Sequence, residues 1–329
     1  MLAIYGAGSV GLALGARLAR AGEEVLFITR DADAARAIDQ DSVRYEDPGS
    51  GEQFEVRATA VADVRAAAER IGPDPVLFCM RRPEAEAASS ALAEHLPGAL
   101  VASLQSDVDG DAVLARHFAR VLSGVVRQTC TRREVNSVAA LGKGRLVVGH
   151  YTGGLEGEAR ALALRLANAG YDVGVSERIA EDKWLKLCVN LMSAPNALIR
   201  RNDHATRAFV ELKAGLLEEA RAVLEAARIT ARSCDGRDRS LDAEIVFQRE
   251  ALARGTSARA LPIYNQVWMS LERRSGSLEA DRYHQRILDL AREHAIPAPL
   301  NARMLDALER AAREACGPES MTAAEILGA

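Results

Sequence analysis

Three glycines near the N-terminus have the spacing of a phosphate-binding turn. They lie in GAGSVG at residues 6–11. Gly6 permits a tight turn, Gly8 lets the backbone approach a pyrophosphate, and Gly11 allows a helix to pack closely on a strand. The N-terminus of the helix that follows supplies backbone N–H donors to an anion. We therefore predict a dinucleotide site that comprises Gly6, Gly8, Ser9, Val10 and Gly11.

A second group of candidate residues lies in EDKWLKLCVN at residues 181–190. Lys186 and Asn190 are four residues apart, so both project from one helix face and can meet one ligand. A lysine with apolar neighbours can have its pKa lowered enough to donate a proton at neutral pH. Reduction of a carbonyl by a nicotinamide hydride needs such an acid. The alternative is that Lys183, Lys186, Asn190 and Ser193 form an ordinary solvated stripe, and spacing alone does not decide between the two.

The glycine turn is positioned by two short apolar runs. Residues 2–5 are partly β-branched and aromatic and stop at glycine, which is typical of a buried parallel strand. The small and apolar residues after Val10 suit a helix that packs on a sheet, and residues 24–29 predict a second strand. The glycines thus stand at a strand-to-helix turn inside a βαβ unit, which is the structural context in which this motif indicates dinucleotide binding.

The end of the second strand indicates which dinucleotide is bound. The order there is Thr29, Arg30, Asp31. An arginine at this place accommodates the 2′-phosphate of NADP, whereas an acidic residue accepts from the ribose hydroxyl of NAD. Arg30 comes first and its planar fork matches a phosphate, so we favour NADP. Asp31 could instead serve NAD or cap the next helix.

Beyond residue 31 the pattern alternates between strands and helices. Residues 42–45 and 53–58 alternate around a turn rich in Asp, Pro and Gly, which predicts a β-hairpin inserted into the Rossmann pattern. After about residue 176 the chain shows long helical periods and no convincing strand. Further strands are expected near residues 75–80, 99–104, 120–124, 145–149 and 171–175, and helices near residues 62–70, 84–95, 157–169, 209–227, 286–294 and 301–315.

These patterns predict an α/β fold in two domains, as the length of 329 residues also suggests. Residues 1–176 would form a Rossmann-type NADP-binding domain, and residues 177–329 an all-helical domain for substrate binding and dimerisation. Ligands of open α/β sheets bind at the carboxyl ends of the strands. We therefore expect the chemistry where the helical domain faces those ends.

Composition narrows the class of partner. The net charge is −4 with charges of both signs interspersed, which gives no reason to propose nucleic acid or a membrane surface. The first strand begins at the N-terminus and no apolar stretch is long enough for a membrane span, so we expect a cytoplasmic protein with a small-molecule substrate. The five cysteines lack disulfide or metal-ligand spacing, so no bound metal is expected. Cys79, Cys130 and Cys188 lie in apolar or strand-like surroundings and are expected to be buried, inert thiols.

Five segments together resemble a known family. They are GAGSVG at residues 6–11, Arg30, KWLKLCVN at residues 183–190, GSLEAD at residues 276–281 and HAIPAPLNARML at residues 294–305. Over essentially the whole chain, the sequence resembles ketopantoate reductases, the NADPH-dependent enzymes of pantothenate biosynthesis that reduce 2-dehydropantoate to pantoate. The resemblance implies a Rossmann domain followed by a helical domain.

The resemblance also implies roles for single residues. Lys186 matches the general-acid lysine of the family, Asn190 matches an asparagine that holds the substrate, and Glu279 matches an essential glutamate. A carboxylate near Lys186 would keep it protonated and orient it, or would accept from the substrate hydroxyl. Arg81 stands where the family usually has a lysine close to the cofactor, which keeps the charge but changes the geometry.

Four positions depart from the family at the substrate. Ser106 in LQSD replaces the asparagine of an Asn-Gly pair, and Ala194 replaces a second asparagine one turn beyond Asn190. Gln266 lies near the place of a serine that contacts the substrate carboxylate. His284 replaces another asparagine and could be a new ligand contact or acid, but a histidine on the helix surface is the simpler expectation. Each buried partner left unpaired costs about 1–3 kcal/mol, so the substrate can differ from ketopantoate.

Three functions remain open on the sequence. The first, which we favour, is NADPH-dependent reduction of a 2-oxo acid, foremost 2-dehydropantoate. The second is reduction of a different carbonyl substrate by a specialised family member. The third is a non-catalytic NADP(H)-binding sensor, against which Lys186 and Glu279 argue because a sensor needs no proton donor. We also favour a homodimer over a monomer.

Overall fold

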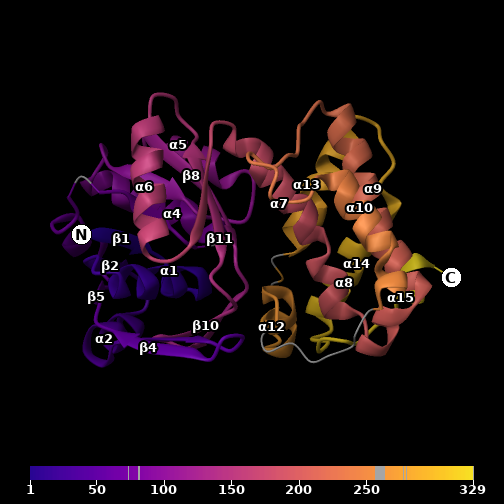
Figure 1. Cartoon of the computed structure of the whole chain (residues 1–329), viewed down its shortest axis with the longest axis horizontal. Coiled ribbons are helices and arrows are strands. Elements are labelled where there is room, and N and C mark those ends of the chain that lie inside the picture. The colour runs from indigo at the N-terminus through magenta and orange to yellow at the C-terminus, as the bar shows by residue number, and fades with distance from the viewer. Residues whose placement is uncertain (73, 81, 256–263, 277, 279, 329) are drawn as a thin grey trace. The chain divides into compact units, whose positions relative to one another are not determined.

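The computed structural model of the chain forms two compact units, residues 1–183 and residues 184–329 (Figure 1). It describes residues 1–72, 74–80, 82–255, 264–276, 278 and 280–328. The α/β fold class with a helical second part is confirmed. The division lies inside helix α7 (Ile179–Leu191) rather than at 176/177, because Ile179 packs with Val125 and Val147 in a core cluster of the first unit.

Unit 1 combines strands and helices in alternation. Its helices are α1 (Ser9–Arg20), α2 (Ala32–Asp41), α3 (Val64–Ala68), α4 (Arg82–His95), α5 (Gly110–Ala115) and α6 (Glu156–Asn168), and α7 begins in it. Its strands are β1 (Leu2–Tyr5), β2 (Val25–Ile28), β3 (Val43–Asp47), β4 (Glu52–Val56), β5 (Thr59–Val61), β6 (Val76–Phe78), β7 (Leu100–Ser103), β8 (Arg120–Arg127), β9 (Cys130–Glu134), β10 (Ser137–Ala140), β11 (Arg145–His150) and β12 (Asp172–Ser176).

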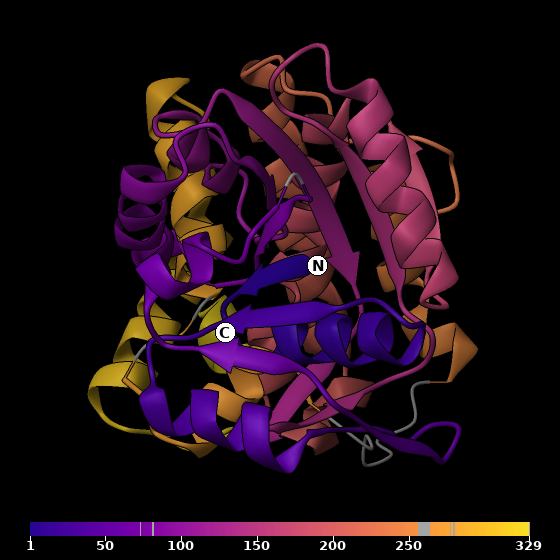
Figure 2. The same ribbon diagram turned by 90° about the vertical axis from the view of Figure 1, so that its left-hand side faces the viewer.

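The main sheet has the strand order β12-β11-β8-β7-β6-β1-β2-β5. The strands from β8 to β5 are parallel, and β11 pairs antiparallel with β8. Side chains alternate between the two faces, so Leu2 and Ile4 share a core with α1 and α6, whereas Ala3 and Tyr5 face α3, α4 and α5. Figure 2 views this unit from the side of the first strands. The order reverses at β1, which places the topological switch point beside the glycine turn.

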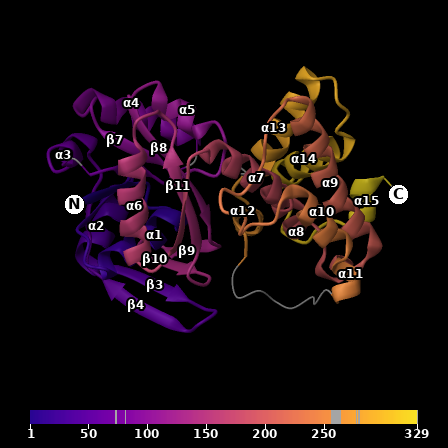
Figure 3. The same ribbon diagram turned by 45° about the horizontal axis from the view of Figure 1, so that its top comes forward.

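A second sheet of order β4-β3-β10-β9 packs on α1 (Figure 3). The predicted hairpin is confirmed as β3 and β4, with Tyr45 stacked on Phe54 at 4.6 Å between ring centroids. The hairpin is inserted between α2 and β5 of the Rossmann pattern, as predicted. It pairs through β3 with β10, which the sequence analysis did not predict, and residues 59–61 leave it to join the main sheet as β5.

Unit 2 holds the rest of α7 and further helices. They are α8 (Ser193–Leu198), the 3-10 helix η1 (Arg201–Ala205), α9 (Arg207–Ala226), α10 (Leu241–Arg249), α11 (Ala251–Arg254), α12 (Gln266–Glu272), α13 (Ala280–Glu293), α14 (Pro299–Arg313) and α15 (Ala323–Leu327). The described residues of this unit contain no strand, only an isolated bridge between Ile199 and Met321. Pro299 opens α14, where its fixed φ suits the first helical position.

Candidate functional site

The glycine turn joins β1 to α1 as predicted. Gly6 has φ +107°, a conformation that favours glycine, and its N–H donates to the Ile28 carbonyl at 2.9 Å. A Cβ at Gly11 would lie 2.0 Å from the Gly6 carbonyl oxygen, so this position admits no side chain. A Cβ at Gly8 would meet no atom within 4 Å. The turn therefore leaves no room for a side chain at Gly11, whereas the backbone at Gly8 is free for a ligand to approach.

The start of α1 fits the pyrophosphate of a dinucleotide. Gly8 is the N-cap, no side chain caps the helix, and the first turn carries no acidic residue. A helix end of this kind presents backbone N–H groups and a positive dipole end to an anion. Ser9 and Val10 begin the helix and are both half-buried. The cofactor residues predicted from GAGSVG are thus brought together at one helix N-terminus.

Arg30 and Asp31 follow β2, the neighbour of β1 in the sheet. The Asp31 carboxylate accepts from the Asp33 N–H at 2.9 Å and is the N-cap of α2. Of the two roles considered for Asp31, helix capping is the one that the structure contains. The Arg30 side chain is 80% exposed, with Nη1 3.9 Å from Oε1 of Glu84. An exposed guanidinium at this strand end suits the 2′-phosphate of NADP.

A row of small residues crosses the main sheet at the level where β7 ends. Ser103, Ser123, Gly149 and Ser176 are aligned by the pairing of β7, β8, β11 and β12. A Cβ at Gly149 would lie 2.8 Å from the Cβ of Ile179, in the first turn of α7. The helix that carries the predicted lysine therefore begins in direct contact with the sheet of unit 1.

A buried ion pair holds the same end of α7. Lys183 Nζ donates to Asp111 Oδ1 at 2.5 Å, and Ser123 Oγ donates to Asp111 Oδ2 at 2.7 Å. Both charged side chains are only 3% exposed. At the end of β12, Ser176 Oγ donates to Asp182, the residue before Lys183, at 2.6 Å. These contacts join α5, β8, β12 and α7 within unit 1.

Lys183 does not belong to a solvated stripe, which was one of the two interpretations of this helix. Its partner Asp111 was not singled out in the sequence either. The two residues lie far apart in the chain, and no local spacing links a lysine on one helix to an aspartate on another. Only the strand register, which brings α5 and α7 to the same sheet edge, identifies the pair.

Ser106 lies in the loop between β7 and α5 and is half-buried. The loop is held by the buried Gln105, whose Nε2 donates to the Met80 carbonyl at 2.8 Å, and by Asp107, which accepts from the Asp109 N–H at 3.0 Å. Ser106 thus stands at the carboxyl end of a central strand, on a loop tied to the neighbouring strand end. Arg81, predicted to bind the cofactor, lies outside the described residues.

Lys186 and Asn190 occupy the part of α7 that belongs to unit 2. Both are half-buried, while Leu185, Leu187 and Cys188 around them are buried. The Asn190 carbonyl accepts from Ser193 Oγ at 2.6 Å, which joins the end of α7 to α8. Ala194 is fully buried. The two candidate residues therefore lie on one helix, four residues apart, with buried apolar side chains beside them.

Gln266 begins α12 and is half-buried. Its neighbour Asn265, which the sequence analysis missed, connects α12 to the α7–α8 junction. The Asn265 side chain accepts from the Trp268 N–H at 2.9 Å and donates to the Ser193 carbonyl at 3.1 Å. An asparagine before an apolar helical run is a recognisable N-cap signal and could have found it. This amide ties the segment of Gln266 to the α7–α8 junction.

His284 is fully buried, which corrects the expectation of a helix-surface histidine. Nδ1 and Oδ1 of Asn301 are 2.9 Å apart, and the Asn301 amide donates to Glu219 at 2.8 Å. Burial lowers the pKa of His284 to about 4, although Asn301 and the Leu191 backbone offset part of this effect. The ring is therefore neutral at physiological pH and joins α13 to α14. Glu279, predicted to be catalytic, lies outside the described residues.

Further features of the described residues concern metal-ligating clusters, reactive thiols and membrane-spanning helices. No cluster of His, Cys, Asp and Glu among the described residues could hold a metal ion. Burial raises the pKa values of the Cys79, Cys130 and Cys188 thiols to about 12, in keeping with inert cysteines. In the part of the chain that the structure describes, every helix is too short or too polar to cross a membrane.

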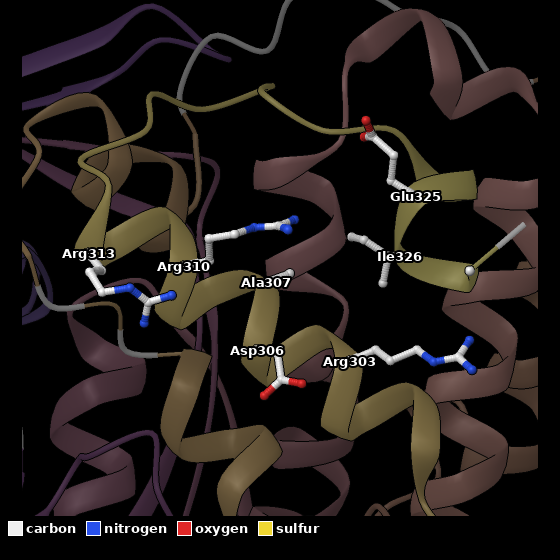
Figure 4. A pocket seen from close by; sticks show the side chains of 8 residues that line it. Arg303, Asp306, Ala307, Arg310, Arg313, Glu325 and Ile326 are labelled. Atoms are coloured by element: carbon white, nitrogen blue, oxygen red, sulfur yellow. The ribbon is translucent and has the colours of Figure 1, made fainter.

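A pocket of about 450 Å³ lies between α14 and α15 in unit 2 (Figure 4). Arg303, Asp306 and Arg310 line it from α14, and Glu325 lines it from α15. Arg303 donates to the Leu327 carbonyl, and Glu325 accepts from the Thr322 N–H at 2.6 Å. These polar groups hold α15 in place, and the pocket contains none of the predicted site residues.

Comparison with known proteins assigns both parts of the chain to one family. The model described as "Ketopantoate reductase PanE/ApbA" matches residues 2–153, and its C-terminal counterpart matches residues 178–312. A 2-dehydropantoate 2-reductase of Archaeoglobus fulgidus is 27% identical over 233 residues, which cover 68% of this chain and 71% of that protein.

Solved structures agree with this assignment. A PanE/ApbA family ketopantoate reductase from Ralstonia eutropha JMP134 has 25% identity and a TM-score of 0.76, over 96% of this chain and 99% of that chain. A D-mandelate dehydrogenase in a ternary structure with NADH and anilino(oxo)acetate has a TM-score of 0.77 over 95% of this chain and 99% of that chain. At 16% identity, the second likeness shows the fold alone.

Proposed function

Because the chain belongs to the ketopantoate reductase family, whose members are NADP-dependent oxidoreductases, we propose that it reduces 2-dehydropantoate to pantoate. The observation that carries the proposal is the placement of Lys186 and Asn190 four residues apart on α7, half-buried among apolar neighbours. The product would enter pantothenate biosynthesis.

The chemistry divides between the cofactor and the chain. NADPH, when bound, supplies a hydride to the carbonyl carbon. Lys186 donates a proton to the carbonyl oxygen, so that negative charge does not accumulate there and an alcohol results. The Asn190 amide, one turn further along α7, can both donate to and accept from the substrate and so orient it. Glu279 would keep Lys186 protonated.

The cofactor residues follow from the geometry of unit 1. The open backbone at Gly8 and the uncapped start of α1 suit the pyrophosphate, and the exposed guanidinium of Arg30 suits the 2′-phosphate. Asp31 caps α2 through Oδ1, so its place after Arg30 is explained without a contact to the cofactor. NADP is therefore the cofactor that this binding turn fits.

A second substrate class is favoured by the positions that depart from the family. Ala194 is fully buried and offers no polar side chain, and the His284 ring is committed to Asn301. These positions provide fewer polar contacts than the asparagines they replace. A 2-oxo acid with a less polar side chain than ketopantoate is thus the alternative substrate.

The test is NADPH oxidation by the purified full chain with ketopantoate and with 2-oxo acids that carry apolar side chains. Lys186→Ala should lower kcat by about 10²–10⁴-fold and leave the Kd of NADPH within about twofold, since a general acid acts mainly in the transition state. Lys143→Ala, at an exposed lysine before β11, is the matched control and should behave as the wild type.

The possible results separate the candidates. Turnover of ketopantoate that Lys186→Ala lacks supports the first proposal, whereas turnover of the apolar 2-oxo acids alone selects the second. Full turnover by Lys186→Ala would remove this lysine from the mechanism. NADPH binding without turnover of any carbonyl compound would contradict both proposals and would favour the non-catalytic NADP(H)-binding sensor.

A further inference from the structure

Arg132 of β9 lies against the glycine turn, although it is distant from that turn in the sequence. Its backbone N–H donates to Oγ of Ser9, the first residue of α1, at 3.0 Å. Its Nη1 donates to the carbonyl of Ala7 at 3.4 Å. Ala7 stands between Gly6 and Gly8, and the Arg132 residue is exposed. The second sheet thus places a permanent positive charge at the dinucleotide turn.

Strand geometry selects which of two adjacent arginines takes this position. Successive side chains of a strand point to opposite faces. Accordingly, Arg133 makes a different contact, and its Nε donates to Oε1 of Glu46 on β3 at 3.2 Å. Both arginines belong to β9, which packs on α1 (Figure 3). Arg132 contacts the glycine turn, whereas Arg133 contacts Glu46 within the second sheet.

We propose that Arg132 binds the pyrophosphate of NADP. The inference rests on the cofactor assignment made above. A pyrophosphate at the start of α1 would lie beside Ala7, Gly8 and Ser9, where the Arg132 guanidinium already is. The first turn of α1 carries no acidic residue that would repel a phosphate. A planar guanidinium matches two phosphate oxygens and makes charge-assisted hydrogen bonds to them.

This role differs from that of Arg30, and the difference can be measured. Arg30 follows β2, where the 2′-phosphate of NADP is expected. NADP and NAD share the pyrophosphate, whereas only NADP has the 2′-phosphate. Loss of Arg132 should therefore weaken the binding of NADPH and of NADH equally, whereas loss of Arg30 should weaken the binding of NADPH alone.

The experiment measures the Kd of NADPH and of NADH by fluorescence titration of the full chain without substrate. Arg132→Ala should raise both values by a similar factor of about 10–100, since a hydrogen bond to a charged group contributes on this order. Its backbone N–H keeps the bond to Ser9, so the fold should persist. Arg133→Ala is the matched control and should change neither Kd.

Three outcomes would overturn the inference. Unchanged binding of both cofactors by Arg132→Ala would show that the guanidinium makes no contact with them. Loss of NADPH binding alone would assign Arg132 to the 2′-phosphate. Wild-type affinity in Arg132→Met, which keeps the aliphatic stem, would show that packing rather than charge matters. Failure of the wild type to bind either cofactor would instead contradict the proposed function.

Discussion

Breaking the buried Asp111–Lys183 pair should destabilise unit 1 strongly, while replacing it completely should not. Lys183→Met leaves Asp111 buried with Ser123 as a hydrogen-bond donor but without a counter-charge. Removal of one partner of a buried pair costs about 3–5 kcal/mol. For a unit of this size, that loss corresponds to a drop in the thermal midpoint of about 6–20 °C. Asp111→Leu should cost a similar amount.

The combined variant Asp111→Leu with Lys183→Met and Ser123→Ala tests the reasoning. Apolar replacement of a buried pair is often neutral or stabilising because the cost of desolvating both charges disappears. We therefore expect the free energy of unfolding of this variant to lie within about 1 kcal/mol of the wild-type value. The sum of the losses in the single variants would be far larger. A combined variant as unstable as the single ones would refute the role of charge burial.

The assay is thermal unfolding followed by circular dichroism, with hydrogen exchange of the segments 110–123 and 179–191 to locate the loss. Arg165→Met is the control. Arg165 pairs with Glu23 and Asp74, which precede β2 and β6 and so lie at the opposite edge of the sheet. Its side chain is more exposed than that of Lys183, so its loss should be smaller and should leave exchange in α7 unchanged.

Two further predictions concern the glycine turn and the buried histidine. Gly8→Ala should fold as the wild type, because its Cβ meets no atom within 4 Å, yet bind NADPH at least about tenfold more weakly. Gly11→Ala should instead lower stability by about 1–3 kcal/mol, because its Cβ would strike the Gly6 carbonyl; unfolding curves and cofactor titrations distinguish the two effects. The pKa of His284 is about 4 in the folded chain and 6.5 in the unfolded chain, so the unfolded chain binds the proton first as the pH falls. The free energy of unfolding should therefore fall by about 3 kcal/mol as the pH drops from 6.5 towards 4. Urea midpoints near pH 7 and pH 4.5 measure this effect, and an equal acid sensitivity in His284→Asn would contradict it.

The sequence by itself determined the features that depend on neighbouring residues. A left-handed Gly6, a Gly11 without room for a side chain and a short strand on each side are consequences of local sterics, so GAGSVG predicts the turn and its ligand class. Helical periods after β12 predict the helical unit for the same reason. Lys186 and Asn190 share a helix face because of their spacing alone.

Only the tertiary structure decided which distant residues meet. The pairing of β3 with β10 builds the second sheet and brings Arg132 to the glycine turn. The register of β7, β8, β11 and β12 brings Asp111 to Lys183, and helix packing buries His284 against Asn301. The periodicity of the sequence predicts which face of a helix or strand is buried. Which residues contact that face depends on how the whole chain packs.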